Sequence, residues 1–131
     1  MNQDIRWKQR YSNFKKAYDQ LTEFMEVSEL NKFEVQGLIQ CFEYTFELSW
    51  KTLKDYLEHE GYDVKTPREV IKKAYQVNII EDGVIWLDAL EKRNLMSHTY
   101  NEQTTLQTKE LITSKYYQMI KKLVEYFSKI E

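Results

Sequence analysis

Residues 32–60 decide the fold, and they read KFEVQGLIQCFEYTFELSWKTLKDYLEHE. Apolar side chains recur every three or four residues along this stretch, as they do on one face of an α-helix. They are Val35, Leu38, Phe42, Phe46, Trp50, Leu53 and Leu57. Gly61 follows and suits the position just beyond a helix end. The pattern predicts one long amphipathic helix over 32–60.

A second long helix is expected before this stretch, over 5–27. Its apolar residues keep the same spacing and are Trp7, Tyr11, Phe14, Tyr18, Leu21 and Met25. A short polar break at 28–31 separates the two helices. Two long helices joined by so short a break predict an antiparallel hairpin.

Three more helices are expected downstream. Thr66-Pro67-Arg68-Glu69 predicts a helix start, with Thr66 as the cap, Pro67 in the first turn and Glu69 completing a capping box. We expect helices over 67–77, 84–97 and 103–129. The expected inward residues of the last two are Trp86, Leu87 and Leu90, then Leu106, Ile112, Tyr116, Met119, Leu123 and Phe127. The prediction is a single all-α domain over 1–131, an antiparallel up-and-down bundle of the four-helix type with an extra short helix.

Composition narrows the class of protein. The chain has 131 residues, with only three Gly and one Pro, which disfavours turn-rich β architectures. Its 19 basic and 21 acidic residues are nearly balanced, so the overall charge demands neither nucleic acid nor a membrane as partner. The single Cys41 cannot form an internal disulfide, which fits a reducing cytoplasm. No stretch is long and apolar enough for a membrane span or a leader, so we expect no membrane and a cytoplasmic protein.

Residue types for metal or cofactor chemistry are sparse. The two histidines, His59 and His98, and the one cysteine show no metal-ligand spacing. There is no glycine-rich phosphate loop and no Asp-x-Asp pair. We therefore expect no metal and no cofactor, and any catalysis should depend on few side chains.

The strongest chemical signature is RNLMSHTY, Arg93 to Tyr100. His98 suits proton transfer near neutral pH, and Arg93 is a permanent cation suited to a phosphate. On a continuous helix, residues five apart differ by about 140° in azimuth, so these two would not share a face. Asn94 and His98, four apart, would share one, and the Asn94 amide could then orient the imidazole. Fraying near Ser97, or a second copy of the chain, could bring Arg93 and His98 together.

Together Arg93 and His98 could cleave RNA without a metal, by 2′-hydroxyl attack. The alternative is that both cations only cap the C-terminus of their helix.

Two further charged groups have alternative interpretations. Glu43, Glu47 and Lys51 form a row on the 32–60 helix, which could line a cleft facing the motif or a partner's nucleotide. The row could instead be a salt-bridged solvent face, which is the commoner role of such a pattern. The first helix is basic, and its cations could guide RNA or simply be solvated. They are Arg6, Lys8, Arg10, Lys15 and Lys16.

The segment 93–100 resembles the Arg-x4-His-x-Tyr motif of HEPN-domain proteins, specifically the HepT group, which is also described as the nucleotidyltransferase substrate-binding protein family. The resemblance extends to FEYTFELSWK at 42–51, TPREVI at 66–71 and Trp86-Leu87, and so covers nearly the whole chain.

The resemblance implies a helical bundle that forms a homodimer and a hetero-oligomer with a separate minimal nucleotidyltransferase. In HepT-type toxin–antitoxin pairs the HEPN protein is an RNase toxin, and the partner is an antitoxin that transfers AMP to the motif tyrosine. By motif position, Arg93 and His98 would be the RNase residues, Asn94 a supporting residue and Tyr100 the AMP acceptor. The competing expectation is a non-catalytic subunit that presents substrate to a nucleotidyltransferase.

Overall fold

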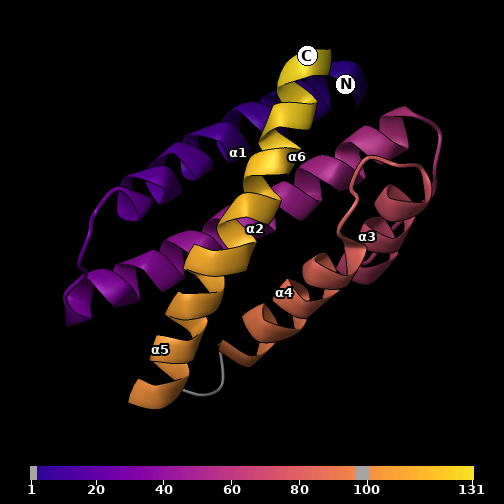
Figure 1. Ribbon diagram of the computed structural model, residues 1–131. Coiled ribbons are helices and arrows are strands. Elements are labelled where there is room, and N and C mark those ends of the chain that lie inside the picture. Colours follow the sequence, from indigo (N-terminus) through magenta and orange to yellow (C-terminus); the bar gives the residue numbers. More distant parts are fainter. Residues whose placement is uncertain (1–2, 97–100) are drawn as a thin grey trace.

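The computed structural model describes residues 3–96 and 101–131, and every regular element within them is helical (Figure 1). This confirms the all-α bundle expected from the sequence. The elements are α1 (Gln3–Met25), α2 (Lys32–His59), α3 (Pro67–Gln76), α4 (Gly83–Met96), α5 (Glu102–Leu111), the π-helical turn η1 (Ile112–Tyr116) and α6 (Tyr117–Ile130).

The central element is α2, which contacts α1, α3, α5 and α6. Helices α1 and α2 form the expected antiparallel hairpin, and α6 crosses over this pair (Figure 1). Helix α4 packs against α3 and η1, and its C-terminal end points toward the start of α5 (Figure 1). The link between α4 and α5 spans residues 97–101, and its first four residues, Ser97, His98, Thr99 and Tyr100, lie outside the described residues.

Both ends of α2 are fixed by its own sequence. The Asn31 side chain accepts a hydrogen bond from the Glu34 amide at 2.8 Å, and the Glu34 carboxylate accepts one from the Asn31 amide at 2.8 Å, a complete capping box. At the other end Gly61 has φ +97°, and the Tyr62 amide donates to the Leu57 carbonyl at 2.9 Å. This is the glycine-dependent helix end that the sequence predicted.

The start of α3 differs from its prediction in one detail. Thr66 caps the helix and accepts from the Glu69 amide at 3.2 Å, as expected. The Glu69 carboxylate, however, accepts from the Lys65 amide at 3.0 Å. The expected reach back to Thr66 is therefore wrong, because the extended backbone before the helix brings the preceding amide within range instead.

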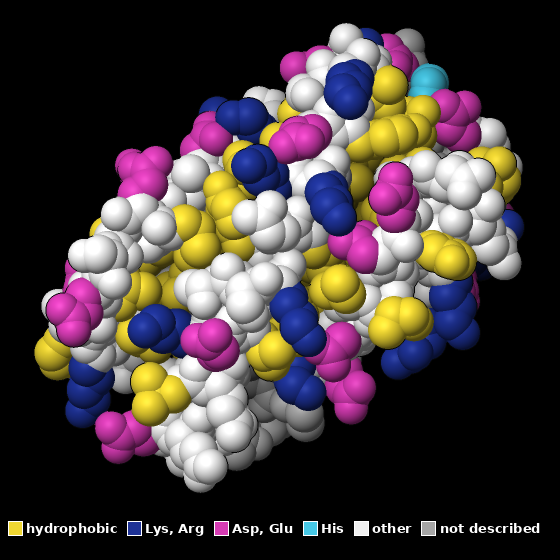
Figure 2. Space-filling model, in the orientation of Figure 1, with side chains coloured by type: hydrophobic (Ala, Val, Ile, Leu, Met, Phe, Trp, Pro, Cys, Tyr) yellow, Lys and Arg dark blue, Asp and Glu magenta, His cyan; other side chains and the backbone are white. Residues whose placement is uncertain are grey.

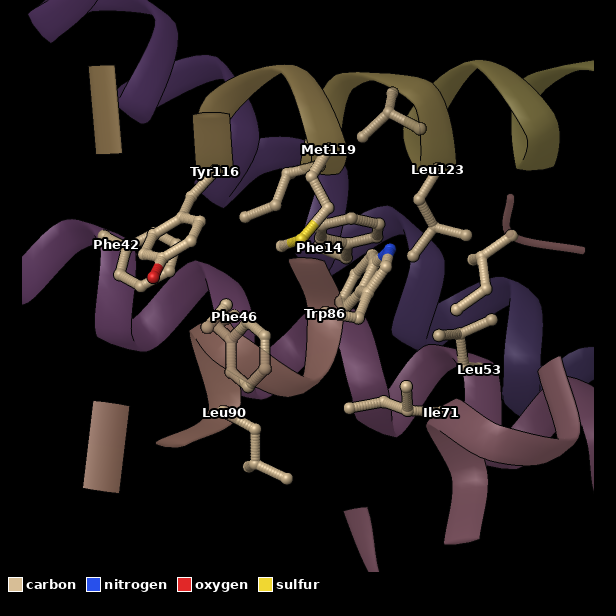
Figure 3. Close-up of a cluster of buried hydrophobic side chains, with 14 of the residues drawn as sticks. Phe14, Phe42, Phe46, Leu53, Ile71, Trp86, Leu90, Tyr116, Met119 and Leu123 are labelled. Atoms are coloured by element: carbon tan, nitrogen blue, oxygen red, sulfur yellow. The ribbon is translucent and has the colours of Figure 1, made fainter. Parts of the chain in front are cut away.

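The core is rich in aromatic side chains and joins α1, α2, α3, α4, η1 and α6 (Figure 3). The Phe42 ring of α2 stacks on Tyr116 of η1, with centroids 5.4 Å apart. The Phe46 ring packs against Trp86 of α4, with centroids 5.6 Å apart. The predicted apolar stripe of α2 is buried except for Trp50, which is half-buried at the edge of this cluster.

The last helix is not the single α-helix that the sequence predicted. A π-turn, η1, interrupts it between α5 and α6. The predicted inward residues from Ile112 onward are buried, but Leu106 is 54% exposed, so its assignment to the core was wrong. Leu106 and Ile112 are six residues apart, which separates them by about 120° around an α-helix, so they do not share a face.

Among the helices so described, none combines the length and apolarity that crossing a membrane requires.

Candidate active site

Arg93 lies on the last turn of α4 and faces the middle of α2. Its Nη2 donates to Oε2 of Glu47, forming an ion pair between residues 46 positions apart in the chain. Its Nη1 donates to Oδ1 of Asn94 at 3.3 Å. The Arg93 side chain is 31% exposed, so the guanidinium is held at one edge and accessible to solvent elsewhere. The first residue of the motif is thus held by Glu47, a residue outside the motif, as well as by its neighbour Asn94.

The Glu47 carboxylate is held by its own helix as well. Trp50 Nε1 donates to Oε2 at 3.2 Å, and Lys51 Nζ lies 3.4 Å from Oε1. Both carboxylate oxygens therefore have cationic or N–H partners. In the row of Glu43, Glu47 and Lys51, the last two residues form an i, i+4 ion pair along α2, and Glu47 also contacts Arg93. The row can therefore be salt-bridged and still face the motif.

Glu43 lies one helical turn before Glu47 on α2. Burial raises the pKa of the Glu43 carboxyl above its ordinary value, and the positive charge of Arg93 opposes that shift. Glu43 is thus close enough to Arg93 to feel its charge in a partly desolvated place. The role of Glu43, Glu47 and Lys51 as lining of a cleft remains a prediction.

Helix α4 is positioned by two buried aromatic residues. Trp86 is fully buried against Phe46, and the Tyr116 hydroxyl of η1 donates to Oδ2 of Asp88. Burial, together with this hydrogen bond to Asp88, raises the pKa of Tyr116 above its ordinary value. Since Asp88 is little more than one turn before Arg93, this bond sets where the last turn of α4 lies.

Sequence reasoning missed Asp88 and Tyr116 as residues that place the motif. Tyr116 was expected only as a core residue, and Asp88 was not singled out. Nothing local could have paired them, because their contact depends on the π-turn that begins at Ile112.

The last four motif residues fall outside the described part of the chain. His98 and Tyr100 are among residues 97–100. The expected partnership of the Asn94 amide with His98 is therefore a prediction, and the contact described for Asn94 is the one with Arg93.

Two of the α1 cations form ion pairs with a residue of another helix. Arg10 Nε donates to Oδ2 of Asp55 at 2.9 Å, and Arg6 Nε lies 3.6 Å from Oδ1 of the same carboxylate. The Asp55 side chain is only 3% exposed. These arginines therefore join α1 to α2. On the face shown in Figure 2, Lys and Arg side chains are interspersed with Asp and Glu, so that face carries no basic stripe.

Among residues 3–96 and 101–131, no three His, Cys, Asp or Glu side chains come together as a metal-binding group. Burial raises the pKa of the Cys41 thiol, and its Sγ lies 3.9 Å from the Ala17 carbonyl oxygen. A thiol of raised pKa between two helices is a poor nucleophile.

These features define a class: an all-helical bundle in which the arginine that begins an Arg-x4-His-x-Tyr motif lies on the last turn of α4 and pairs with a carboxylate of α2. Residues 9–129 match the family described as nucleotidyltransferase substrate binding protein like, and the chain belongs to that family.

Similarities to a curated relative and to a solved structure support this family assignment. Over 97 residues the chain is 26% identical to probable ribonuclease HepT of Haemophilus influenzae, covering 63% of this chain. The chain spans 66% of that relative's length, just under two thirds. A crystal structure of a Thermus thermophilus protein superposes with a TM-score of 0.78 and 31% identity, covering 86% of this chain and 96% of the other. The resemblance to the HepT-like, nucleotidyltransferase substrate-binding family is confirmed.

Proposed function

We propose that this protein is a HepT-like, metal-independent endoribonuclease, the toxin of a toxin–antitoxin pair whose antitoxin is a separate minimal nucleotidyltransferase. The observation that supports the proposal most directly is the position of Arg93. This partly exposed cation begins the motif at the end of α4 and is held by an ion pair with Glu47. The similarity to a protein named probable ribonuclease HepT supports the ribonuclease activity proposed for this chain. An RNA substrate and a single, unpaired Cys41 fit a cytoplasmic location.

In the proposed reaction His98 removes the proton from a ribose 2′-hydroxyl, and the 2′-oxygen attacks the adjacent phosphorus. The bond to the 5′-oxygen of the next nucleotide breaks, and the imidazolium returns the proton to that oxygen. Arg93 stabilises the charge that develops on the phosphorane oxygens. The products are a 2′,3′-cyclic phosphate and a 5′-hydroxyl, and no cofactor is needed.

The direct test is cleavage of an end-labelled RNA in EDTA by the purified protein. We expect activity in the wild type, none in His98→Ala or Arg93→Ala, and no cleavage where the scissile ribose is 2′-deoxy. His59→Ala is the matched control, because His59 lies at the far end of α2 with Asp4 3.7 Å away and should be dispensable. Cleavage undiminished in both motif variants would identify a contaminating nuclease and contradict the proposal.

Tyr100 is the proposed site of neutralisation. The Tyr100 phenol attacks the α-phosphorus of ATP bound to the nucleotidyltransferase, pyrophosphate leaves and the phenol loses its proton. The added AMP phosphate would compete with RNA for Arg93.

Co-expression with the nucleotidyltransferase encoded next door, followed by peptide mass mapping, tests this step. AMP should appear on Tyr100 and be absent from Tyr100→Phe, which the partner should no longer neutralise. Tyr44→Phe, a tyrosine 59% exposed on α2, is the control and should change nothing. Equal neutralisation of the Tyr100→Phe protein would mean that inhibition depends on binding alone.

A homodimer is part of the proposal, because Arg93 and His98 would differ by about 140° if one continuous helix carried both, and a second chain could then supply the missing partner. Exposed apolar side chains provide contact surface, notably Phe33 at 76% and Leu106 at 54% exposure. Light scattering at micromolar concentration should give twice the chain mass of 16.0 kDa. A strictly monomeric protein would contradict this part.

The family's description favours a second candidate, a non-catalytic subunit that presents substrate to a nucleotidyltransferase. The two candidates differ in what expression of this chain alone does to cells. The toxin should halt growth in a manner abolished by His98→Ala, whereas the substrate-binding subunit should not affect growth.

A further inference from the structure

Glu47 is the described residue that makes an ion pair with the motif arginine, and it comes from a different helix. Its carboxylate bridges Arg93 of α4 and the pair Trp50 and Lys51 on the next turn of α2. We propose that Glu47 is a positioning residue that sets the plane of the Arg93 guanidinium for the RNA phosphate. This inference rests on the proposed ribonuclease function and assigns a residue outside the motif to it.

The geometry of a guanidinium explains why an anchor matters. Its N–H groups lie in one plane, so fixing one edge fixes the direction of all the others. In Arg93 the Nη2 edge is bound to Glu47, and Nη1 bonds to Asn94 at 3.3 Å. An unanchored arginine would have to lose its rotamer freedom when RNA binds and during the reaction.

Glu47 is suited to orient Arg93 because its carboxylate is itself held in a fixed position. Trp50 Nε1 at 3.2 Å and Lys51 Nζ at 3.4 Å fix the carboxylate from within its own helix, so it is held in place independently of α4. The Lys51 charge balances that of the carboxylate, and the trio of Arg93, Glu47 and Lys51 retains one positive charge. The Glu47 carboxylate therefore does not by itself cancel the charge of Arg93, whose side chain is 31% exposed to an incoming phosphate.

Glu47→Ala is the central variant, compared in RNA cleavage under single-turnover and steady-state conditions. Loss of orientation should lower kcat by about tenfold or more and change KM by less than about threefold, because the arginine charge remains while its alignment is lost. Glu47→Gln keeps an oxygen that accepts from Arg93 and should recover part of kcat. That graded recovery distinguishes positioning from a purely structural role.

Glu58→Ala is the matched control. Glu58 lies on the same helix, is 28% exposed like Glu47, and pairs with Lys54 at 3.0 Å instead of reaching α4. It should lose no more thermal stability than Glu47→Ala and retain wild-type kcat. If Glu47→Ala proves poorly folded, Glu47→Gln alone decides, since it preserves shape and hydrogen bonding.

Failure of this inference and failure of the proposed function give different results. Active wild type, inactive His98→Ala and wild-type kcat in both Glu47 variants would overturn the positioning role alone. Faster cleavage or tighter RNA binding in Glu47→Gln would also overturn it, since the carboxylate would then be masking the cation. A wild type that cleaves no RNA refutes the proposed function, and this inference with it.

Discussion

The carboxylate of Asp55 offers a stringent test of what the arginines of α1 do. The change is Asp55→Asn, which keeps shape and removes charge. Asp55 is 3% exposed, with Arg10 Nε at 2.9 Å and Arg6 Nε at 3.6 Å. In the variant the guanidinium groups of Arg6 and Arg10 face the neutral Asn side chain where α1 packs against α2. We expect a clear loss of stability without loss of the fold.

The size of the loss follows from burial. Breaking a fully buried pair costs about 3–5 kcal/mol, and an exposed pair contributes about 0–1 kcal/mol. Here the acid is buried, but Arg10 is 33% and Arg6 47% exposed, so water can rehydrate the cations. An intermediate value of about 2 kcal/mol is expected. With an unfolding entropy of about 2.1 cal/mol/K per residue and 131 residues, the melting temperature should fall by about 7 °C.

Thermal unfolding followed by circular dichroism at the helix band measures this directly. Asp19→Asn is the control: its carboxylate lies 2.7 Å from Lys15 Nζ, closer than either Asp55 pair, but is 58% exposed. It should shift the melting temperature by less than about 2 °C, because a solvated pair contributes little. Equal shifts for the two variants would refute the reasoning that burial, and not distance, decides the contribution.

Measuring both stability and RNA cleavage distinguishes an arginine that holds the fold together from one that binds RNA. Arg10→Gln should destabilise the protein and leave RNA cleavage by the folded fraction unchanged. A salt-dependent loss of RNA affinity at unchanged stability would instead mean that α1 guides RNA.

Three further outcomes follow from the structure. Burial raises the pKa of Tyr18 to about 12 and the pKa values of Tyr56 and Tyr116 above 10. Their contribution to stability is therefore complete below pH 10 and lost as pH rises toward 12, so the urea midpoint should fall only above pH 10. Burial also raises the pKa of Glu43 above its ordinary value of 4.5. The contribution of Glu43 to folding stability is therefore complete below about pH 4.5 and is lost as the pH rises through the pKa of the folded protein. Glu43→Gln should accordingly raise the melting temperature at pH 7 and not at pH 4; no gain at pH 7 would contradict this sign. Gly61→Ala should cost about 1 kcal/mol in urea unfolding, because φ at this position is +97°.

Helix positions could be predicted wherever the signal was local. Asn31 and Thr66 cap their helices with their own side chains, and Gly61 ends α2 through its own backbone. Such signals need no knowledge of the rest of the fold. The apolar spacing of α2 likewise predicted its buried face, since that face is fixed by helix geometry alone.

The π-turn could not be predicted in this way. A π-turn forfeits regular helical hydrogen bonds and is stabilised by contacts elsewhere. For η1 these are the stacking of Tyr116 on Phe42 and its hydrogen bond to Asp88. Both partners belong to other helices, so the pattern of residues 103–129 alone favoured an uninterrupted helix.

The candidate site was predictable in its residue types and not in its pairings. The row of Glu43, Glu47 and Lys51 was identified because residues four apart share a helix face. Its meeting with Arg93 depends on how α4 lies across α2. That placement depends on the burial of Trp86 against Phe46, a contact between residues 40 positions apart that periodicity does not encode.

The placement of Arg93 is thus a property of the bundle and not of the motif alone. Helix α4 has 14 residues, a length at which an isolated helix is marginal in water. Its position is set at mid-helix by Trp86 and Asp88 and at its end by the ion pair with Glu47. Loosening the Asp88 contact should therefore act on Arg93 at a distance, through the direction of α4, while leaving the arginine charge intact. An Arg-x4-His-x-Tyr pattern in a chain without such anchors would not by itself orient the cation for chemistry.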